Sequence, residues 1–178
     1  MIYSAAFKVC IFGDPGVGKT SLTHRYITNR FIQDTKLTIG ADIVAKDVMI
    51  NNYKVKLQIW DFGGAERFKI FFPTFARGSS GGIFMYDITR KSSLDKIEEW
   101  LNIFKKNLTK EESQIIILGV GGKKDLDYNR EITLENAENL ALKHNIFEII
   151  ECSAKTGENV DKIFEYITYK MLMNSGLI

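Results

Sequence analysis

Eight consecutive residues near the start of the chain have the spacing of a phosphate-binding loop. Residues 13–20 read Gly-Asp-Pro-Gly-Val-Gly-Lys-Thr, a G-x-x-x-x-G-K-[ST] pattern between an apolar run and a helical pattern. The glycines let consecutive backbone N–H groups point into one concavity that binds phosphate oxygens, and the start of the following helix adds to the attraction. Lys19 would bridge terminal phosphates and the Thr20 hydroxyl would ligate Mg²⁺. An ordinary glycine-rich turn is the alternative. The expected phosphate-binding residues here are Gly13, Asp14, Pro15, Gly16, Val17, Gly18, Lys19, Thr20 and Ser21.

A second carboxylate near the metal is expected from Asp61. It follows an alternating segment and precedes Phe62, Gly63 and Gly64. The carboxyl end of a strand is where α/β folds bind their ligands, so Asp61 would hold Mg²⁺ through a water molecule. The two glycines leave the backbone free to approach a γ-phosphate and to move when it leaves. A plain turn is again the alternative.

The periodicity of apolar residues predicts the elements that position these groups. Strands are expected at residues 7–12, 43–50, 54–59, 82–86, 115–120 and 146–150, with Asn51 and Asn52 forming a tight turn. Helices are expected at residues 18–28, 94–108, 133–141 and 160–171, the second behind a capping pair, Ser92 and Asp95. This alternation predicts one domain, residues 1–178, with a three-layer α/β fold and helices on both faces of a mostly parallel sheet.

Composition excludes several classes of protein. The 178 residues suit one domain, and 24 basic against 22 acidic residues give a net charge of +2, too balanced for a nucleic-acid or anionic-membrane binder. No apolar run approaches the roughly 20 residues of a membrane span. Cys10 and Cys152 are expected to be small buried hydrophobes in a reducing cytosol. We therefore expect a cytoplasmic monomer with no nucleic-acid partner.

The order and spacing of these motifs, and of others along nearly the whole chain, resemble the Ras-like small GTPases, the Rab branch most closely. Besides the phosphate loop, the resemblance lies in residues 38–42 (TIGAD), 60–68 (WDFGGAERF), 86–89 (YDIT), 123–126 (KKDL) and 152–160 (CSAKTGENV). It implies a P-loop NTPase fold with a six-stranded, mostly parallel sheet and five helices. It also implies bound GTP or GDP with Mg²⁺ and two mobile segments that read the γ-phosphate.

The resemblance assigns roles to further residues. Thr38 would bind Mg²⁺ and the γ-phosphate, and Gly64 would give its N–H to the same phosphate, so the implied metal ligands are Thr20, Thr38 and Asp61. Asp125 would accept from the two ring-edge donors of guanine, while the Ala154 N–H would donate to the guanine carbonyl. The implied base-binding residues are Phe31, Lys123, Asp125, Leu126, Ser153, Ala154 and Lys155. For Phe31, a place in the core is the alternative.

The first departure from the family pattern is Ala65, where the family has a glutamine that orients the attacking water. A methyl group can neither donate nor accept, and loss of one positioned polar group costs orders of magnitude in rate. No catalytic residue is therefore assigned, and very slow intrinsic hydrolysis is predicted. Glu66 as a substitute, or a partner that supplies the missing group, is the alternative.

Two further departures concern nucleotide binding. Gly122 stands where the motif Asn-Lys-x-Asp has its asparagine. Without the hydrogen bonds of that asparagine, we expect affinity for GTP about ten- to a hundredfold lower than with it, weaker selectivity for guanine and faster nucleotide exchange. Pro15 lacks an N–H and has a restricted φ in the phosphate loop. It would either hinder an arginine inserted by a partner or have no effect.

Three functions stay open at this stage. The first is a slow GTP-operated switch that presents residues 35–42 and 64–76 to effector, exchange-factor and activating proteins. Ile43, Trp60, Phe68 and Phe75 would be its apolar contact residues, or simply core. The second is a module that holds GTP without turnover. The third, another P-loop enzyme such as a kinase or an ATPase, is disfavoured because no extra base or lid is found. The last five residues include no cysteine for a prenyl anchor. Either the chain is trimmed or it does not use such an anchor, and without one, membrane residence would need a protein partner.

Overall fold

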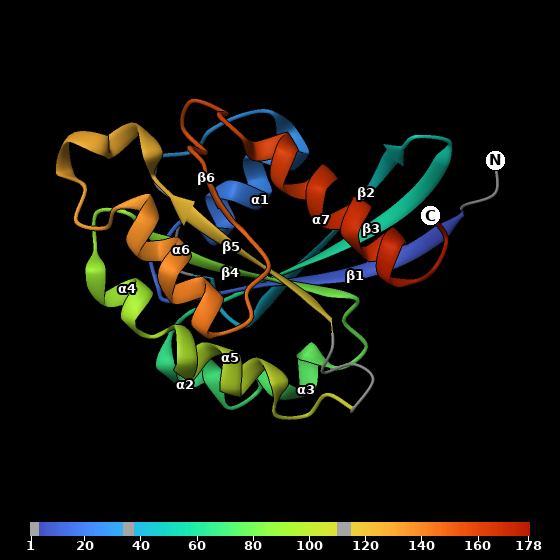
Figure 1. Cartoon of the computed structure of the whole chain (residues 1–178), viewed down its shortest axis with the longest axis horizontal. Coiled ribbons are helices and arrows are strands. Elements are labelled where there is room, and N and C mark those ends of the chain that lie inside the picture. The colour runs from blue at the N-terminus through green and yellow to red at the C-terminus, as the bar shows by residue number, and fades with distance from the viewer. Residues whose placement is uncertain (1–3, 34–37, 110–114) are drawn as a thin grey trace.

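A six-stranded sheet forms the centre of the computed structural model, which describes residues 4–33, 38–109 and 115–178 (Figure 1). The strand order is β2-β3-β1-β4-β5-β6, and every neighbouring pair is parallel except β2 and β3. The strands are β1 (Ala5–Phe12), β2 (Ala41–Ile50), β3 (Tyr53–Phe62), β4 (Gly81–Asp87), β5 (Ile116–Gly122) and β6 (Ile149–Glu151). The α/β fold and the mostly parallel sheet are confirmed.

The described residues contain seven α-helices and a short 3-10 helix, more than the five helices expected. The helices are α1 (Lys19–Thr28), α2 (Glu66–Lys69), α3 (Phe72–Ala76), α4 (Lys91–Asp95), α5 (Ile97–Lys105), η2 (Lys124–Asn129), α6 (Leu134–Lys143) and α7 (Val160–Asn174). The excess arises because residues 66–76 form two short helices and because the helix expected at 94–108 is divided at Lys96 (φ −84°, ψ 10°).

The expected capping pair of Ser92 and Asp95 is wrong, whereas the start of α6 is as expected. Helix α4 already begins at Lys91, so Ser92 lies inside it, and neither α4 nor α5 has a side-chain cap. The neighbouring Ser93 hydroxyl instead donates to the Arg90 carbonyl at 2.7 Å and accepts from the Asp87 N–H at 3.0 Å. At α6, the Thr133 hydroxyl accepts from the Asn136 N–H at 3.2 Å.

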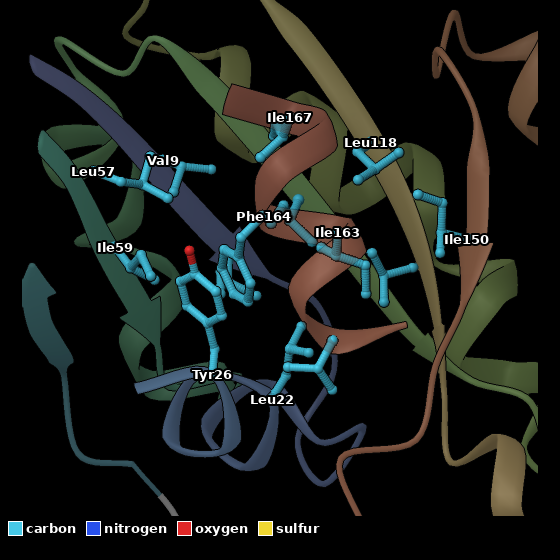
Figure 2. Packing of buried hydrophobic residues seen from close by; sticks show 14 of the residues in the cluster. Val9, Leu22, Tyr26, Leu57, Ile59, Leu118, Ile150, Ile163, Phe164 and Ile167 are labelled. Carbon is cyan, nitrogen blue, oxygen red and sulfur yellow. The ribbon is translucent and has the colours of Figure 1, made fainter. Parts of the chain in front are cut away.

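Helices α1 and α7 cover one face of the sheet, and α3, α4, α5 and α6 cover the opposite face (Figure 1). Successive side chains of β1 divide between the two cores, because strand residues alternate in direction: Val9 and Ile11 belong to one core, Cys10 and Phe12 to the other. Figure 2 shows the first core, where side chains of α7 meet those of α1 over one face of the sheet. The Tyr26 and Phe164 rings stack there with centroids 3.9 Å apart.

Both cysteines are fully buried, as expected from their apolar surroundings. Burial raises the pKa of the Cys10 thiol to about 11 and that of the Cys152 thiol to about 12. Both thiols are therefore protonated at neutral pH and behave as small apolar side chains. Among the described residues, no helix is long and apolar enough to cross a membrane.

Parallel pairing brings the carboxyl ends of four strands to one edge of the sheet. Ile11 pairs with Asp61, Phe12 with Phe84, and Asp87 with Gly122. The loops that follow β1, β3, β4 and β5 therefore converge at this edge, where ligands bind in folds of this class.

Candidate nucleotide-binding site

The phosphate loop leaves β1 at Gly13 and ends where α1 begins. Gly13 has φ +143°, and a Cβ there would lie 2.1 Å from the Met85 carbonyl oxygen. Gly18, the residue before α1, has φ +106°. Only glycine adopts such conformations without strain, so the glycine pattern reflects the curl of the loop.

Lys19 lies beneath the loop as a buried cation. Its Nζ donates to the carbonyl oxygens of Gly13 at 2.8 Å and Asp14 at 2.7 Å. Desolvation by burial lowers the pKa of Lys19 to about 8, against the opposing effect of nearby Asp61. Two of the three ammonium protons are used in these bonds, which leaves one for an anionic ligand.

A cluster of three oxygen-bearing side chains lies beside the loop. The Thr20 hydroxyl donates to Asp61 Oδ2 at 2.5 Å and lies 2.7 Å from the Thr38 hydroxyl. The other carboxylate oxygen, Asp61 Oδ1, is buried with no hydrogen-bond partner among the described residues. Burial raises the pKa of Asp61 to about 6. A buried carboxylate oxygen without a partner, beside two hydroxyls, fits a hard cation such as Mg²⁺.

This cluster would supply only part of a metal's coordination shell. The described residues contain no group of three His, Cys, Asp or Glu side chains that could hold a metal ion. Mg²⁺ keeps several waters and takes ligands from phosphates, so two hydroxyls and one carboxylate suit it.

The segment after β3 packs against the phosphate loop. A Cβ at Gly64 would lie 2.5 Å from the Gly13 carbonyl oxygen, and one at Gly63 would lie 2.3 Å from the Thr38 carbonyl oxygen. The Gly63 N–H donates to the Gly40 carbonyl at 2.9 Å. Glycine is therefore required at both positions, because only backbone fits between these segments.

A first cavity, called the phosphate cavity below, lies beside the phosphate loop, and Ala65 borders it with a methyl group. The lining of this cavity comprises Pro15, Gly16, Gly18, Lys19, Thr20, Ser21, Thr38, Phe62, Gly63, Gly64 and Ala65. Glu66 does not take the place of a polar residue at 65, because its side chain is 82% exposed and pairs with Lys69 at 2.8 Å. The alternative role considered for Glu66 is therefore not supported by its position.

A second cavity of about 320 Å³ adjoins the loop on its other side. Its lining comprises Gly16, Val17, Gly18, Ser21, Phe31, Gln33, Met85, Lys123, Asp125, Leu126, Ala154 and Lys155. Six of the seven expected base-binding residues are here, and Phe31 is 37% exposed rather than part of the core. Gln33 and Met85 were not expected, since neither has a sequence signal beyond its local element.

Ser153, the seventh expected residue, positions a neighbour instead of lining the cavity. Its hydroxyl donates to Asp125 Oδ1 at 2.7 Å and accepts from the Thr156 N–H at 3.1 Å. The Lys123 side chain is also held by a neighbour: its Nζ forms an ion pair of 2.6 Å with Asp87 Oδ2, and its backbone has φ +65°. The base side of the site is thus held by contacts among three loops.

Asp14 and Pro15 attach the phosphate loop to the rest of the domain. The Asp14 carboxylate turns away from the cavity, accepting from Trp100 Nε1 at 2.9 Å and pairing with Lys96 at 2.9 Å. The Pro15 carbonyl accepts from Arg90 Nη2 at 2.7 Å. These partners of the loop were not expected from the sequence, because isolated charged or aromatic residues do not indicate which distant residue they contact.

Apolar side chains also lie exposed beside the phosphate cavity. Ile43 is 52% exposed and pairs in the sheet with Trp60, whose ring centroid lies 6.1 Å from that of Phe75, itself 40% exposed. Trp60 and Phe68 are partly buried. Of the segment 35–42, residues 35–37 lie outside the described residues. Ile43 and Phe75 are therefore surface residues and not simply core.

Comparison with known proteins gives one consistent family. A model of the Ras family matches residues 8–173. The GTP-binding protein ypt3 of Schizosaccharomyces pombe is 36% identical over 178 residues, covering 98% of this chain and 81% of that protein. Ras-related protein Rab-13 of Bos taurus is 37% identical over 174 residues (98% and 84%), and Ras-related protein Rab-18-B of Danio rerio is 38% identical over 170 residues (96% and 81%).

Proposed function

Because this chain belongs to the Ras family and is a Rab-like small GTPase, we propose that its two cavities bind one GTP or GDP with Mg²⁺ and that GTP is hydrolysed only slowly. The observation that carries the proposal is the convergence of three features at one sheet edge. These are the buried cation Lys19, the Thr20, Thr38 and Asp61 cluster, and the Asp125 carboxylate facing the second cavity.

The phosphate end supports binding of a di- or triphosphate. Lys19 has a buried charge without a full counter-charge, and its lowered pKa reflects that cost. Phosphate oxygens would supply the counter-charge, and the loop N–H groups would supply further donors. Mg²⁺, held by Thr20, Thr38 and Asp61, would neutralise the charge shared by the terminal phosphates.

The base end supports guanine over adenine. The Asp125 carboxylate is an acceptor held in place by the Ser153 hydroxyl. Guanine presents two adjacent N–H donors at its ring edge, whereas adenine presents one donor and one acceptor, so a carboxylate favours guanine. Ala154 lines the same cavity, where its N–H would donate to the guanine carbonyl oxygen.

Slow hydrolysis is supported by what borders the phosphate cavity. Ala65 contributes only a methyl group there, and Glu66 faces solvent. Orienting the attacking water requires a positioned donor or acceptor, and the Ala65 side chain supplies neither. The non-hydrolysing module is the second candidate, and the same observation at Ala65 favours it.

Segments 38–42 and 64–76 would act as the reading surface for partner proteins. Thr38 and Gly64 border the phosphate cavity, so the identity of the nucleotide would bias their conformation. Ile43, Trp60 and Phe75 adjoin them and offer an apolar patch that effector, exchange-factor or activating proteins would contact.

Competitive displacement tests the nucleotide assignment. Purified protein is loaded with fluorescent GDP, and release is followed on addition of GTP, GDP or ATP, each with Mg²⁺ and again with EDTA. We expect GTP and GDP to displace the probe at concentrations about a hundredfold or more below ATP, as a site with two matched base hydrogen bonds requires. EDTA should accelerate release. Equal displacement by ATP would contradict guanine recognition.

A further inference from the structure

Met85 lines the second cavity, beneath Gly18, which borders both cavities. It lies on β4, is 1% exposed and belongs to the core beneath the phosphate loop. Its Cε lies 2.6 Å from where a Cβ at Gly122 would be and 3.3 Å from where one at Gly18 would be. Because real Cβ atoms do not approach other atoms as closely as 2.6 Å, the methionine methyl and a side chain at 122 exclude each other in this arrangement.

We propose that Met85 is a positioning residue for the nucleotide, whose thioether end supports the phosphate loop in the space that a side chain at position 122 would need. The inference rests on the proposed function, since it concerns how the same site is held together. Met85 and Gly122 would then form a coupled pair, because the side chain at one position limits what the other position can hold.

Lack of space, and not backbone conformation, is what prevents a side chain at position 122. Its φ is not positive, unlike that of Gly13, Gly16 and Gly18, so an L side chain would be unstrained there. A Cβ would, however, lie 2.6 Å from Met85 Cε and 2.8 Å from the Val17 carbonyl oxygen. The first neighbour is the end of a flexible side chain, but the second is backbone of the phosphate loop. A side chain at 122 would therefore displace both Met85 and the loop.

Met85 contacts the loop at both of its ends. Its carbonyl oxygen lies 2.1 Å from where a Cβ at Gly13 would be, and its methyl group faces Gly18, the residue before α1. Val17, between them, is fully buried in the same core as Met85. Methionine is unbranched and adaptable, which suits it to fill this irregular space. Shortening it would leave a void under the loop, and that void would weaken the position of the N–H groups that bind phosphate.

A double-mutant cycle tests the coupling. Met85→Val, Gly122→Asn and the double variant are compared with the wild type by the dissociation rate of fluorescent GDP in Mg²⁺. We expect each single variant to release GDP about tenfold faster, because one leaves a void and the other displaces the loop. The double variant should release GDP more slowly than the two single effects multiplied together would give, since valine removes the contact between Met85 Cε and the asparagine side chain, while the contact with the Val17 carbonyl stays. Rates that multiply across the two substitutions would contradict the coupling.

Met171→Val is the matched control. Met171 is also a buried core methionine, 2% exposed, but its sulfur lies against Gly81, and it lines neither cavity. It should lower the thermal unfolding temperature without changing GDP release. If Met85→Val changes release no more than Met171→Val does, Met85 is only a core residue and the inference fails.

The methyl resonances of the wild type provide a readout that needs no stable variant. In protein labelled at methionine methyl carbons, GDP addition should shift the Met85 signal and leave the Met171 signal in place, with assignment by the two valine variants. Binding of GDP without a Met85 shift would overturn the inference alone. Absence of any guanine-nucleotide binding by the wild type would instead contradict the proposed function.

Discussion

The phosphate end and the base end of the site are built in different ways. The phosphate end depends mainly on backbone groups of one continuous loop, together with Lys19, Thr20 and Asp61. The base end is assembled from side chains at the end of β4 and on the segments that follow β5 and β6, joined by Lys123–Asp87 and Ser153–Asp125 contacts. The loop at the phosphate end has every fixed residue of its motif, with proline at the variable position 15, whereas position 122 at the base end is a glycine without a side chain.

This difference indicates where the chain tolerates change. A cradle of backbone N–H groups is disrupted by any side chain that needs space, as the close contacts around Gly13 and Gly64 show. A base pocket made from separate side chains can lose one contact and keep the others, with apolar packing by Met85 in its place. We therefore expect the phosphate end to dominate affinity and the base end to set selectivity.

The largest effect should come from Lys19→Met. It removes the buried cation whose Nζ donates to the Gly13 and Asp14 carbonyls, and we expect GDP and GTP affinity to fall by about a thousandfold or more. Titration calorimetry measures this loss. Lys143→Met, at an exposed lysine on α6, is the matched control and should bind like the wild type. Similar affinities for the two variants would contradict the dominance of the phosphate end.

Asp125→Asn should have the next largest effect. An amide offers one acceptor and one donor where guanine needs two acceptors, so we expect GTP affinity to fall by about a hundredfold while xanthine nucleotides, with one donor and one acceptor at that edge, bind better. Competition between GTP and XTP measures the change. Asp127→Asn, at an exposed carboxylate paired with Arg130, is the control. Unchanged preference in Asp125→Asn would place base recognition elsewhere.

Ser153→Ala should have the smallest effect. It removes the 2.7 Å hydrogen bond to Asp125 but no group that lines the cavity. One hydrogen bond of this kind corresponds to about a three- to tenfold change in an equilibrium. We expect GDP release to accelerate by that factor, measured by stopped-flow fluorescence, with the preference for guanine retained. A loss as large as that of Asp125→Asn would mean that Ser153 contacts the base itself.

The sequence predicted the fold and the curl of the loop at residues 13–20, while the binding roles of the loop residues stay predictions. The glycine spacing of residues 13–20 depends on local backbone geometry, so a short motif was sufficient. The sheet was predicted from apolar runs and one alternating segment. An apolar run indicates a strand covered on both faces, and alternation indicates a strand covered on one face. Strand and helix boundaries were less accurate, and the division of the helix near Lys96 had no signal, since it depends on a backbone kink in an otherwise helical pattern.

Contacts between residues far apart in the chain could not be predicted from the sequence. Asp14 and Trp100 are 86 positions apart, and Arg90 reaches Pro15 across 75. Met85 looks like any apolar residue of a buried strand, and only the fold places its methyl group against Gly122. The lower affinity expected from Gly122 assumes that an asparagine there could reach the base. Because Met85 and the Val17 carbonyl occupy the space that its side chain needs, we expect Gly122→Asn alone to displace the phosphate loop and to weaken binding instead of strengthening it.

The measurement that tests the account most directly is single-turnover hydrolysis of bound GTP. Wild type and Ala65→Gln are loaded with GTP and Mg²⁺, freed of excess nucleotide, and the bound GTP and GDP are quantified over hours after denaturation. We expect GTP to persist in the wild type and to decay more than about tenfold faster in Ala65→Gln, because a side chain able to orient water then borders the cavity. Equal rates in the two proteins would contradict the assignment of slow hydrolysis to Ala65.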